Sequence, residues 1–305
     1  MSAPRLGIGI IGAGRVGAAL GAALRAEGHA ITGAYAVSEA SRARAAEMLP
    51  DVPLLGVDRI VERSELVLLA VPDDQLAPLA AGIAATGLAP GGQIFAHTSG
   101  LHGIDSLAPL ERTGGIALAM HPAMTFTGTP ADLPRLVGCP VAVTARESFL
   151  PIAQALVVEI GGEPVTLAEG DRALYHAALS HGANHLVVLV DQARELLASI
   201  GIEDPGVYLR PLLTAALEES LRRGRKALTG PVSRGDAGTV TAHLEALAEA
   251  DGATGDTRST YRALALAALA RAGLGEQEDR TIREILQGPA DGAAQGPADE
   301  AADEA

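Results

Sequence analysis

The sequence predicts an α/β protein in which a doubly wound sheet is followed by an all-helical domain. A short apolar strand runs directly into a glycine-rich turn and a helix at the start of the chain. Strand and helix patterns then alternate to about residue 167, and beyond it only helical patterns remain. We therefore expect a sheet domain at 1–167, a helical domain at 168–287 and a disordered acidic tail at 288–305.

The opening turn carries three glycines, Gly12, Gly14 and Gly17, at the spacing G-x-G-x-x-G. In a strand-turn-helix, the first glycine permits the tight turn, the second lets a pyrophosphate approach the backbone, and the third lets helix and strand pack closely. The helix N-terminus then presents free N–H groups to the phosphates. We expect Gly12, Gly14, Arg15, Val16 and Gly17 to bind a dinucleotide; the alternative is a turn of purely structural use.

The end of the second strand, residues 30–37, indicates which dinucleotide binds. An NAD site places a carboxylate there to bind the ribose hydroxyls. This chain has Ser38 instead, with Arg42 and Arg44 close behind, and these groups suit the 2′-phosphate of NADP. NADP is therefore expected over NAD, although Glu39 weakens the distinction. In the alternative, Ser38 only caps the next helix and the arginines are a solvated face.

The next strand, an apolar run over 65–71, has the pattern of a strand buried on both faces and stops at Pro72. Ligands of open parallel sheets bind beyond the carboxyl ends of the strands. We therefore expect Ala70, Val71 and Pro72 to line the adenosine or pyrophosphate side of a cleft. Further strands are expected at 94–96, 115–120, 141–143 and 164–167, with a helix at 149–160 before the last.

Two of these strands end in polar residues, which should converge near the nicotinamide. His97, Thr98 and Ser99 follow one strand, and His121 follows the next. We expect His97 and Thr98 to contact the cofactor and Ser99 and His121 to act on the substrate. Each histidine can equally be a satisfied structural group.

The helical half is expected to contain helices at 169–199, 205–217, 239–250, 259–271 and 278–286. Polar residues on the first of them, among them Asn184, either face the cleft or cross-link helices. A loop at 228–236 ends in Asp236, which can cap the next helix. Arg234 beside it can clamp a carboxylate with two hydrogen bonds, although the cap alone explains the loop.

Composition limits the function classes. The formal net charge of −14 argues against nucleic acid as a partner. Cys139 is the only cysteine, so an intrachain disulfide or cysteine metal cluster is impossible, and no metal centre is expected. Neither a signal peptide nor a membrane-spanning run is apparent, so we expect a soluble cytoplasmic protein without membrane partners.

The motifs together resemble a known family: Rossmann-like proteins that carry a DUF2520 C-terminal domain. The resemblance covers residues 5–287 and is most specific in the stretch 230–236. This family looks like a branch of the β-hydroxyacid dehydrogenase and ketopantoate reductase superfamily. The resemblance implies a Rossmann-type sheet, a helical domain like that of 6-phosphogluconate dehydrogenase, binding of NADP or NAD, and a homodimer formed through the helical domain.

The resemblance also implies a departure at the reacting centre. Better-known relatives protonate the nascent alkoxide with a lysine four residues before a helical asparagine. Asn184 matches that asparagine, but Ser180 stands at the lysine position.

The expected activity is NADPH-dependent reduction of the carbonyl of a small 2-oxo acid, with ketopantoate as the first candidate and pantothenate synthesis as its setting. In this hypothesis Arg234 clamps the carboxylate, and His121, with a near-neutral pKa, donates the proton. Ser99 and Asn184 hold the carbonyl oxygen. Two alternatives stay open: an NADP-binding regulatory protein without catalysis, and an enzyme that resembles the F420-linked or imine reductases.

Overall fold

The computed structural model describes residues 5–250 and 255–288, and it divides the chain into two compact units. The sheet unit ends at Asn184 and the helical unit begins at His185. The expected boundary at residue 167 is therefore too early. Helix α8 (Arg172–Ser199) spans the division, and its first half packs with the sheet unit through Arg172 and Tyr175, as described below.

The sheet unit contains seven strands in the order β2-β1-β3-β4-β5-β6-β7. They are β1 (Gly7–Ile11), β2 (Ala30–Tyr35), β3 (Leu66–Leu69), β4 (Ile94–His97), β5 (Ile116–Pro122), β6 (Pro140–Ala145) and β7 (Glu163–Thr166). Neighbouring strands are parallel except β5 and β6, which pair antiparallel. Every expected strand is confirmed, and an isolated bridge also joins Leu54 to Ala34.

The strand order reverses at β1, which has β2 on one side and β3 on the other. The connections from these strands leave in opposite directions, so a crevice opens beyond their carboxyl ends. Gly12 stands at the end of β1 and Ala70 at the end of β3. The glycine turn therefore lies at the switch point of the sheet.

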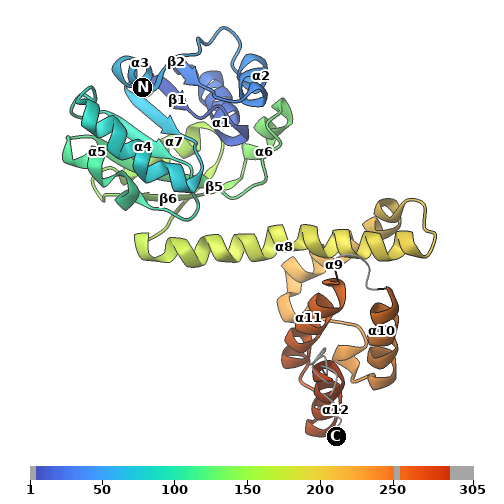
Figure 1. Cartoon of the computed structure of the whole chain (residues 1–305). Helices are drawn as coiled ribbons and strands as arrows, with labels where there is room; N and C mark the ends of the chain where they lie inside the picture. The colour runs from blue at the N-terminus through green and yellow to red at the C-terminus, as the bar shows by residue number, and fades with distance from the viewer. Residues whose placement is uncertain (1–4, 251–254, 289–305) are drawn as a thin grey trace, which may run out of the picture. The chain divides into compact units, whose positions relative to one another are not determined.

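Helices cover both faces of the sheet, as Figure 1 shows for the blue-to-green part of the chain. One core lies under α1 (Arg15–Ala26), α2 (Glu39–Met48), α6 (Leu133–Leu136) and α7 (Leu150–Glu159). The other lies under α3 (Val57–Arg63), α4 (Asp73–Thr86) and α5 (Ala108–Arg112). Central strands buried on both faces explain the continuous apolar pattern of β3.

The helical unit contains the second half of α8 and then α9 (Pro205–Arg223), α10 (Ala237–Ala250), α11 (Thr257–Ala272) and α12 (Glu276–Gln287). Its buried core joins α10, α11 and α12 through Val240, Leu269 and Ile282. The sequence predicted these helices, although α9 extends beyond the expected end at residue 217. The expected disordered tail lies outside the described residues from 289 onward.

Among the described helices, none combines the length and the apolar composition needed to cross a bilayer.

Candidate functional site

The glycine turn has the conformation that its spacing predicts. Gly12 has φ +100°, and a Cβ there would overlap the carbonyl oxygen of Ala70. A Cβ on Gly17 would overlap the carbonyl oxygen of Gly12. These two glycines therefore permit the turn and the close packing of helix α1 on the sheet.

Gly14 differs from both, because a Cβ built on it meets no atom within 4 Å. It is the N-cap of α1, with φ −73°, and no side chain caps the helix there. The N–H groups of Arg15, Val16 and Gly17 donate to no acceptor among the described residues. An open cradle of free donors at the positive end of a helix fits a pyrophosphate, so these residues can hold a dinucleotide.

The residues after β3 border this turn as expected. Ala70 and Val71 both lie within 3.4 Å of the Cβ positions of Gly12 or Gly17. They are half-buried, and Pro72 beyond them is exposed. This places all three beside the pyrophosphate cradle.

Basic groups surround the end of β2. The side chains of Arg15 and Arg44 converge on Gly128, and Arg42 donates from Nε to the carbonyl oxygen of Ala36 at 3.4 Å. Within the described ranges, none of these three arginines forms an ion pair. Ser38 caps α2 by accepting the N–H of Ser41 at 3.1 Å. Ser38 therefore caps the helix, its contact with a cofactor stays a prediction, and the arginines, which form no ion pair, can bind a phosphate.

The loop that reaches Arg15 and Arg44 is held by a buried carboxylate that sequence reasoning missed. Asp132 is 0% exposed and accepts N–H donations from Thr127 at 3.0 Å and Gly128 at 2.7 Å. Burial raises its pKa, but these hydrogen bonds outweigh burial and leave the pKa below its ordinary value. The ionised carboxylate thus fixes Gly128 beside the two arginines.

His97 has a structural role in place of the cofactor contact expected for it. Its side chain is 0% exposed, its Nδ1 accepts the N–H of Ser99 at 3.2 Å, and its Nε2 lies 2.9 Å from the carbonyl oxygen of Gly103. Nε2 must therefore carry the proton and donate it to Gly103. Burial lowers the pKa of His97 to about 4, so the ring is neutral and has no free edge for a ligand.

Thr98, next in the chain, is half-buried and donates its N–H to the carbonyl oxygen of Leu69 at 3.3 Å. It stays at the carboxyl edge of the sheet, between the ends of β3 and β4.

Ser99 is also more enclosed than expected. It is 8% exposed, and its hydroxyl accepts the N–H of His102 at 3.0 Å. Its carbonyl oxygen accepts from Nη1 of Arg172 at 2.9 Å. Ser99 therefore shapes the loop after β4, and its hydroxyl is less accessible to a substrate than its expected role requires.

Arg172 is a second group that sequence reasoning missed. It is 0% exposed and donates to Thr144 Oγ1 at 2.8 Å and to the carbonyl oxygens of Ser99, Ala119 and Ala142. No carboxylate accepts from it among these bonds. Burial lowers its pKa, but an arginine starts so high that it keeps its charge. One guanidinium therefore joins α8 to β5, to β6 and to the loop after β4, and it places a positive charge close to His121.

His121 lies at the centre of the remaining polar cluster, at the end of β5. Its Nδ1 is 2.9 Å from the hydroxyl of Tyr175, and the ring of His176 meets it edge-on at 6.2 Å between centroids. The turn of Gly100 packs against both histidines: a Cβ there would lie 3.0 Å from Nε2 of His121. Two adjacent residues of α8 and the turn at Gly100 thus surround one imidazole.

A cavity of about 310 Å³ adjoins this imidazole within the sheet unit. Its polar lining includes His121, His176, Ser180 and Asn184, and its other lining residues are Ala123, Met124, Thr125, Leu179 and Ala183. Helix α8 thus brings Asn184 to the cavity that His121 lines, which fits the cleft-facing one of the two alternatives that the sequence left open. Its size suits a small molecule.

The charge state of His121 corrects one expectation. Burial and the nearby His176 and Arg172 lower its pKa to about 4, despite the opposing charge of Asp73. A near-neutral pKa was expected for a proton donor. At physiological pH the ring is therefore neutral, and it can donate only its N–H proton.

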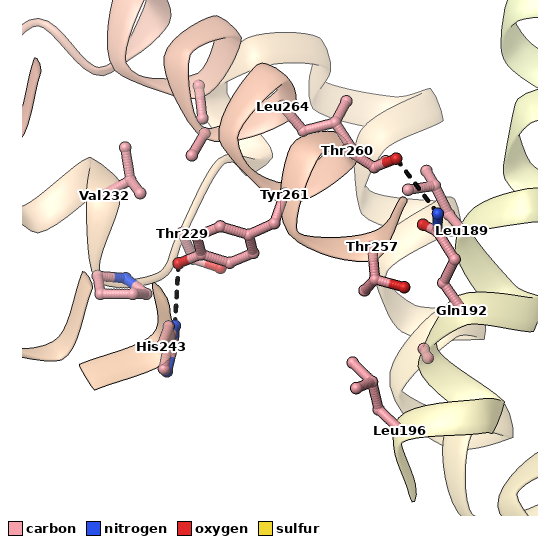
Figure 2. Close-up of a pocket in the computed structure, with 14 residues that line it drawn as sticks. Leu189, Gln192, Leu196, Thr229, Val232, His243, Thr257, Thr260, Tyr261 and Leu264 are labelled. Atoms are coloured by element: carbon pink, nitrogen blue, oxygen red, sulfur yellow. Dashed lines mark hydrogen bonds between the residues drawn. The ribbon is translucent and has the colours of Figure 1, made fainter. Parts of the chain in front are cut away.

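The helical unit contains a separate cavity of about 370 Å³ with a mostly apolar lining (Figure 2). His243 Nδ1 lies 2.9 Å from the hydroxyl of Tyr261, and Gln192 donates to Thr260 Oγ1 at 3.2 Å. Pro231 and Val232 from the expected loop form part of the wall. Figure 2 shows these two hydrogen bonds on either side of the cavity.

The rest of that loop follows its prediction in part. Asp236 caps α10 by accepting the N–H of Thr239 at 3.0 Å. Arg234 is exposed beside it, in a short 3-10 turn at Val232–Arg234. Its carboxylate-clamp role stays a prediction, because Arg234 belongs to the helical unit and His121 to the sheet unit.

Solved structures of similar fold are known. An inferred NADP oxidoreductase from Bacteroides fragilis is 20% identical, with a TM-score of 0.74 over 87% of this chain and 98% of that one. An imine reductase from Myxococcus stipitatus, solved with NADP+, is 16% identical over 87% and 92% of the two chains, with a TM-score of 0.60. Pyrroline carboxylate reductase from Plasmodium falciparum, solved with NADP, is 11% identical over 92% and 98%, with a TM-score of 0.55. At these identities the likeness establishes the fold.

Family models match both parts of the chain, whereas a search of the curated proteins found no match. The Rossmann-like domain matches residues 1–122, which hold the glycine turn and His121. DUF2520, a domain of unknown function, matches residues 139–268, which include Asn184 and the Arg234 loop. The chain is therefore similar to a Rossmann-like domain in its first part and to DUF2520 in its second.

Proposed function

We propose that this protein is an NADP-dependent oxidoreductase that reduces the carbonyl of a small 2-oxo acid. The observation that carries the proposal is the open cradle at Gly14, because the fold leaves space and free N–H donors where a pyrophosphate would lie. The unpaired Arg15, Arg42 and Arg44 favour a cofactor with a 2′-phosphate. The solved relatives with NADP are consistent with this choice.

The cavity beside His121 is the proposed substrate site. When bound, the reduced cofactor would supply the hydride. The chain's own groups orient the acceptor: Asn184 and Ser180 offer hydrogen bonds, and Ala123 and Leu179 exclude water. The cavity's apolar walls and few polar groups suit a small, partly polar molecule.

The 2-oxo acid is the proposed substrate class, with ketopantoate the first candidate. Resemblance to the ketopantoate reductase superfamily supports it, as does Arg234, an exposed guanidinium able to clamp a carboxylate. Asn184 and Ser99 were expected to hold the carbonyl oxygen. With the Ser99 hydroxyl enclosed, Asn184 is the stronger candidate of the two.

Two rival functions share the cofactor. An NADP-binding regulatory protein is favoured by Ser180, which stands where relatives have a lysine. An imine reductase is favoured by the fold of the solved relatives. Both rival functions include NADPH binding, so only the identity of the substrate, if there is one, distinguishes them from the proposed function.

The test is NADPH consumption by the purified protein with ketopantoate, other short 2-oxo acids and cyclic imines. Turnover of a 2-oxo acid is the expected result. Turnover of imines alone would overturn the substrate class, and NADPH binding without turnover of either class would favour the regulatory protein.

A further inference from the structure

The hydrogen bond between Tyr175 and His121 defines how a proton can reach the cavity. The hydroxyl of Tyr175 lies 2.9 Å from Nδ1 of His121 and has no other hydrogen-bond partner among the described residues. A phenol is a good donor, and the neutral imidazole offers one acceptor nitrogen. We therefore assign the donation from Tyr175 to Nδ1, which leaves the ring proton on Nε2.

The other edge of the ring is the one without a hydrogen bond. His121 lines the 310 Å³ cavity, whereas Tyr175 is not among its lining residues. Nε2 has no hydrogen-bond partner in the described chain, and Gly100 lets the backbone pass close to it without a side chain. A residue that lines the cavity thus has a ring N–H without a partner among the described residues.

The charges around the ring keep it neutral. The groups that act on it are His176 and Arg172 from α8, which oppose protonation, and Asp73 from the start of α4, which favours it weakly. No Asp, Glu, Lys or Arg is among the residues that line the cavity. A charged general acid is therefore absent from the lining, and Ser180 does not replace one.

Resting on the proposed function, we propose that Tyr175 and His121 form a proton relay that serves a carbonyl substrate. The reduced cofactor, when bound, would supply the hydride to the carbonyl carbon, and the substrate oxygen takes the proton from Nε2 of His121. Nδ1 takes the proton of the Tyr175 hydroxyl in the same step. The products are the alcohol, a neutral imidazole protonated on Nδ1, and a tyrosinate.

Water restores the relay. Nε2 takes up the one proton that each turnover consumes from the bulk solvent, and Nδ1 returns its proton to the tyrosinate, so the starting tautomer is regenerated. The cation of Arg172 stabilises the transient tyrosinate, as its effect in lowering the pKa of Tyr175 indicates. Burial has the larger and opposite effect on that pKa, which keeps the phenol protonated between turnovers.

The relay also discriminates between substrate classes. A carbonyl oxygen becomes an alkoxide and needs a proton, whereas an iminium becomes a neutral amine and needs none. The positive charge of Arg172 would also repel an iminium cation, and no carboxylate lines the cavity to compensate for this repulsion. The site therefore favours a carbonyl over an imine.

Nuclear magnetic resonance tests the relay in the protein alone. In protein labelled with ¹⁵N-histidine, His121 should show protonated Nε2, unprotonated Nδ1 and a pKa near 4. The Tyr175→Phe variant should lose this fixed pattern and populate both tautomers. A ring protonated on Nδ1 in the unmodified protein would overturn the relay.

Kinetics provide the second readout. Tyr175→Phe should lower kcat for the carbonyl substrate about a hundredfold, with KM and the Kd of NADPH unchanged. Tyr208→Phe is the matched control, because Tyr208 is 64% exposed on α9 of the helical unit and should leave kcat unchanged. An unchanged kcat in Tyr175→Phe would overturn the relay.

The outcomes separate the relay from the proposed function. Failure to bind NADPH would refute the proposed function whatever the tautomer of His121. Binding and turnover of imines, but of no carbonyl, would overturn the relay and its substrate class while leaving an oxidoreductase.

Discussion

Two glycines of one turn have different reasons to be glycine. Gly12 is required by the protein itself, because its φ of +100° and the carbonyl oxygen of Ala70 exclude a side chain. Gly14 has φ −73° and open space beyond its Cα, so the protein alone does not require it. Only a bound ligand would require a glycine at position 14.

Substitutions at these glycines should therefore separate folding from binding. Gly14→Asp adds a good N-cap and a negative charge, so the melting temperature should be retained while NADPH affinity falls at least a hundredfold. Gly12→Ala should lower the melting temperature, because alanine is strained at a positive φ and its Cβ would overlap the carbonyl oxygen of Ala70. The expected loss of unfolding free energy is on the order of 3 kcal/mol. Calorimetric titration and thermal melts measure both effects. Equal NADPH affinity in Gly14→Asp and the unmodified protein would contradict the cradle.

His97 predicts a pH dependence of stability. Burial lowers its pKa from 6.5 to about 4 in the folded protein, so the unfolded chain binds the proton first as pH falls. The stability that neutral His97 contributes is therefore present above pH 6.5 and is lost between pH 6.5 and 4. The loss is at most about 3 kcal/mol.

The His97→Gln variant removes this titration while its amide can still donate to Gly103. Urea unfolding at pH 7.5 and 4.5 should show a smaller acid-induced loss of unfolding free energy in this variant than in the unmodified protein. Parallel pH curves for the two proteins would show that His97 is not the titrating group.

At the scale of elements, the end of β2 and the start of α2 are proposed to select the coenzyme. Arg42→Ala with Arg44→Ala should weaken NADPH binding at least tenfold and leave NADH binding unchanged, because a charged hydrogen bond to phosphate contributes about 1.5–3 kcal/mol. Arg59→Ala is the control, since Arg59 pairs with Glu62 on α3. Equal losses of affinity for NADPH and for NADH would show that the two arginines do not bind the 2′-phosphate.

Local sequence patterns were enough for most elements. The glycine turn, the buried strands and the helices of both units follow from spacing and apolar periodicity, and the structure confirms them. The division within α8 could not be predicted, because a continuous helix carries no local signal of which core its two halves join. Only contacts made across the fold reveal it.

The site was less predictable for the same reason. Arg172 donates hydrogen bonds to groups 28 to 73 residues away in the sequence. Its burial therefore depends on distant strands, and the residues next to it in the sequence do not indicate it. The enclosure of His97 likewise depends on the loop that brings Gly103 to its ring. His121 and Asn184 were predicted because strand ends and helical spacing place them in one region, but the neutral state of His121 needs the fold.

At the scale of the molecule, the helical unit exposes apolar side chains that a second copy could bury. Leu212 is 67% exposed and Leu221 is 80% exposed on α9, alongside Val187 at 68% on α8. Exposed apolar clusters of this kind are typical of interfaces. We therefore propose a homodimer formed through the helical unit.

Leu212→Glu combined with Leu221→Glu should convert the dimer to a monomer, because two buried charges would lack partners. Light scattering coupled to size exclusion measures the mass of each form. Val158→Glu, at a 61% exposed site of the sheet unit, should remain dimeric. A monomeric unmodified protein would contradict the proposed assembly.

The most direct measurement is calorimetric titration of the purified full chain with NADPH and with NADH. One NADPH should bind per chain, more tightly than NADH, and Gly14→Asp should abolish the heat of binding while remaining folded. Absence of binding by either coenzyme to the folded protein would contradict the proposal that the turn after β1 holds a pyrophosphate.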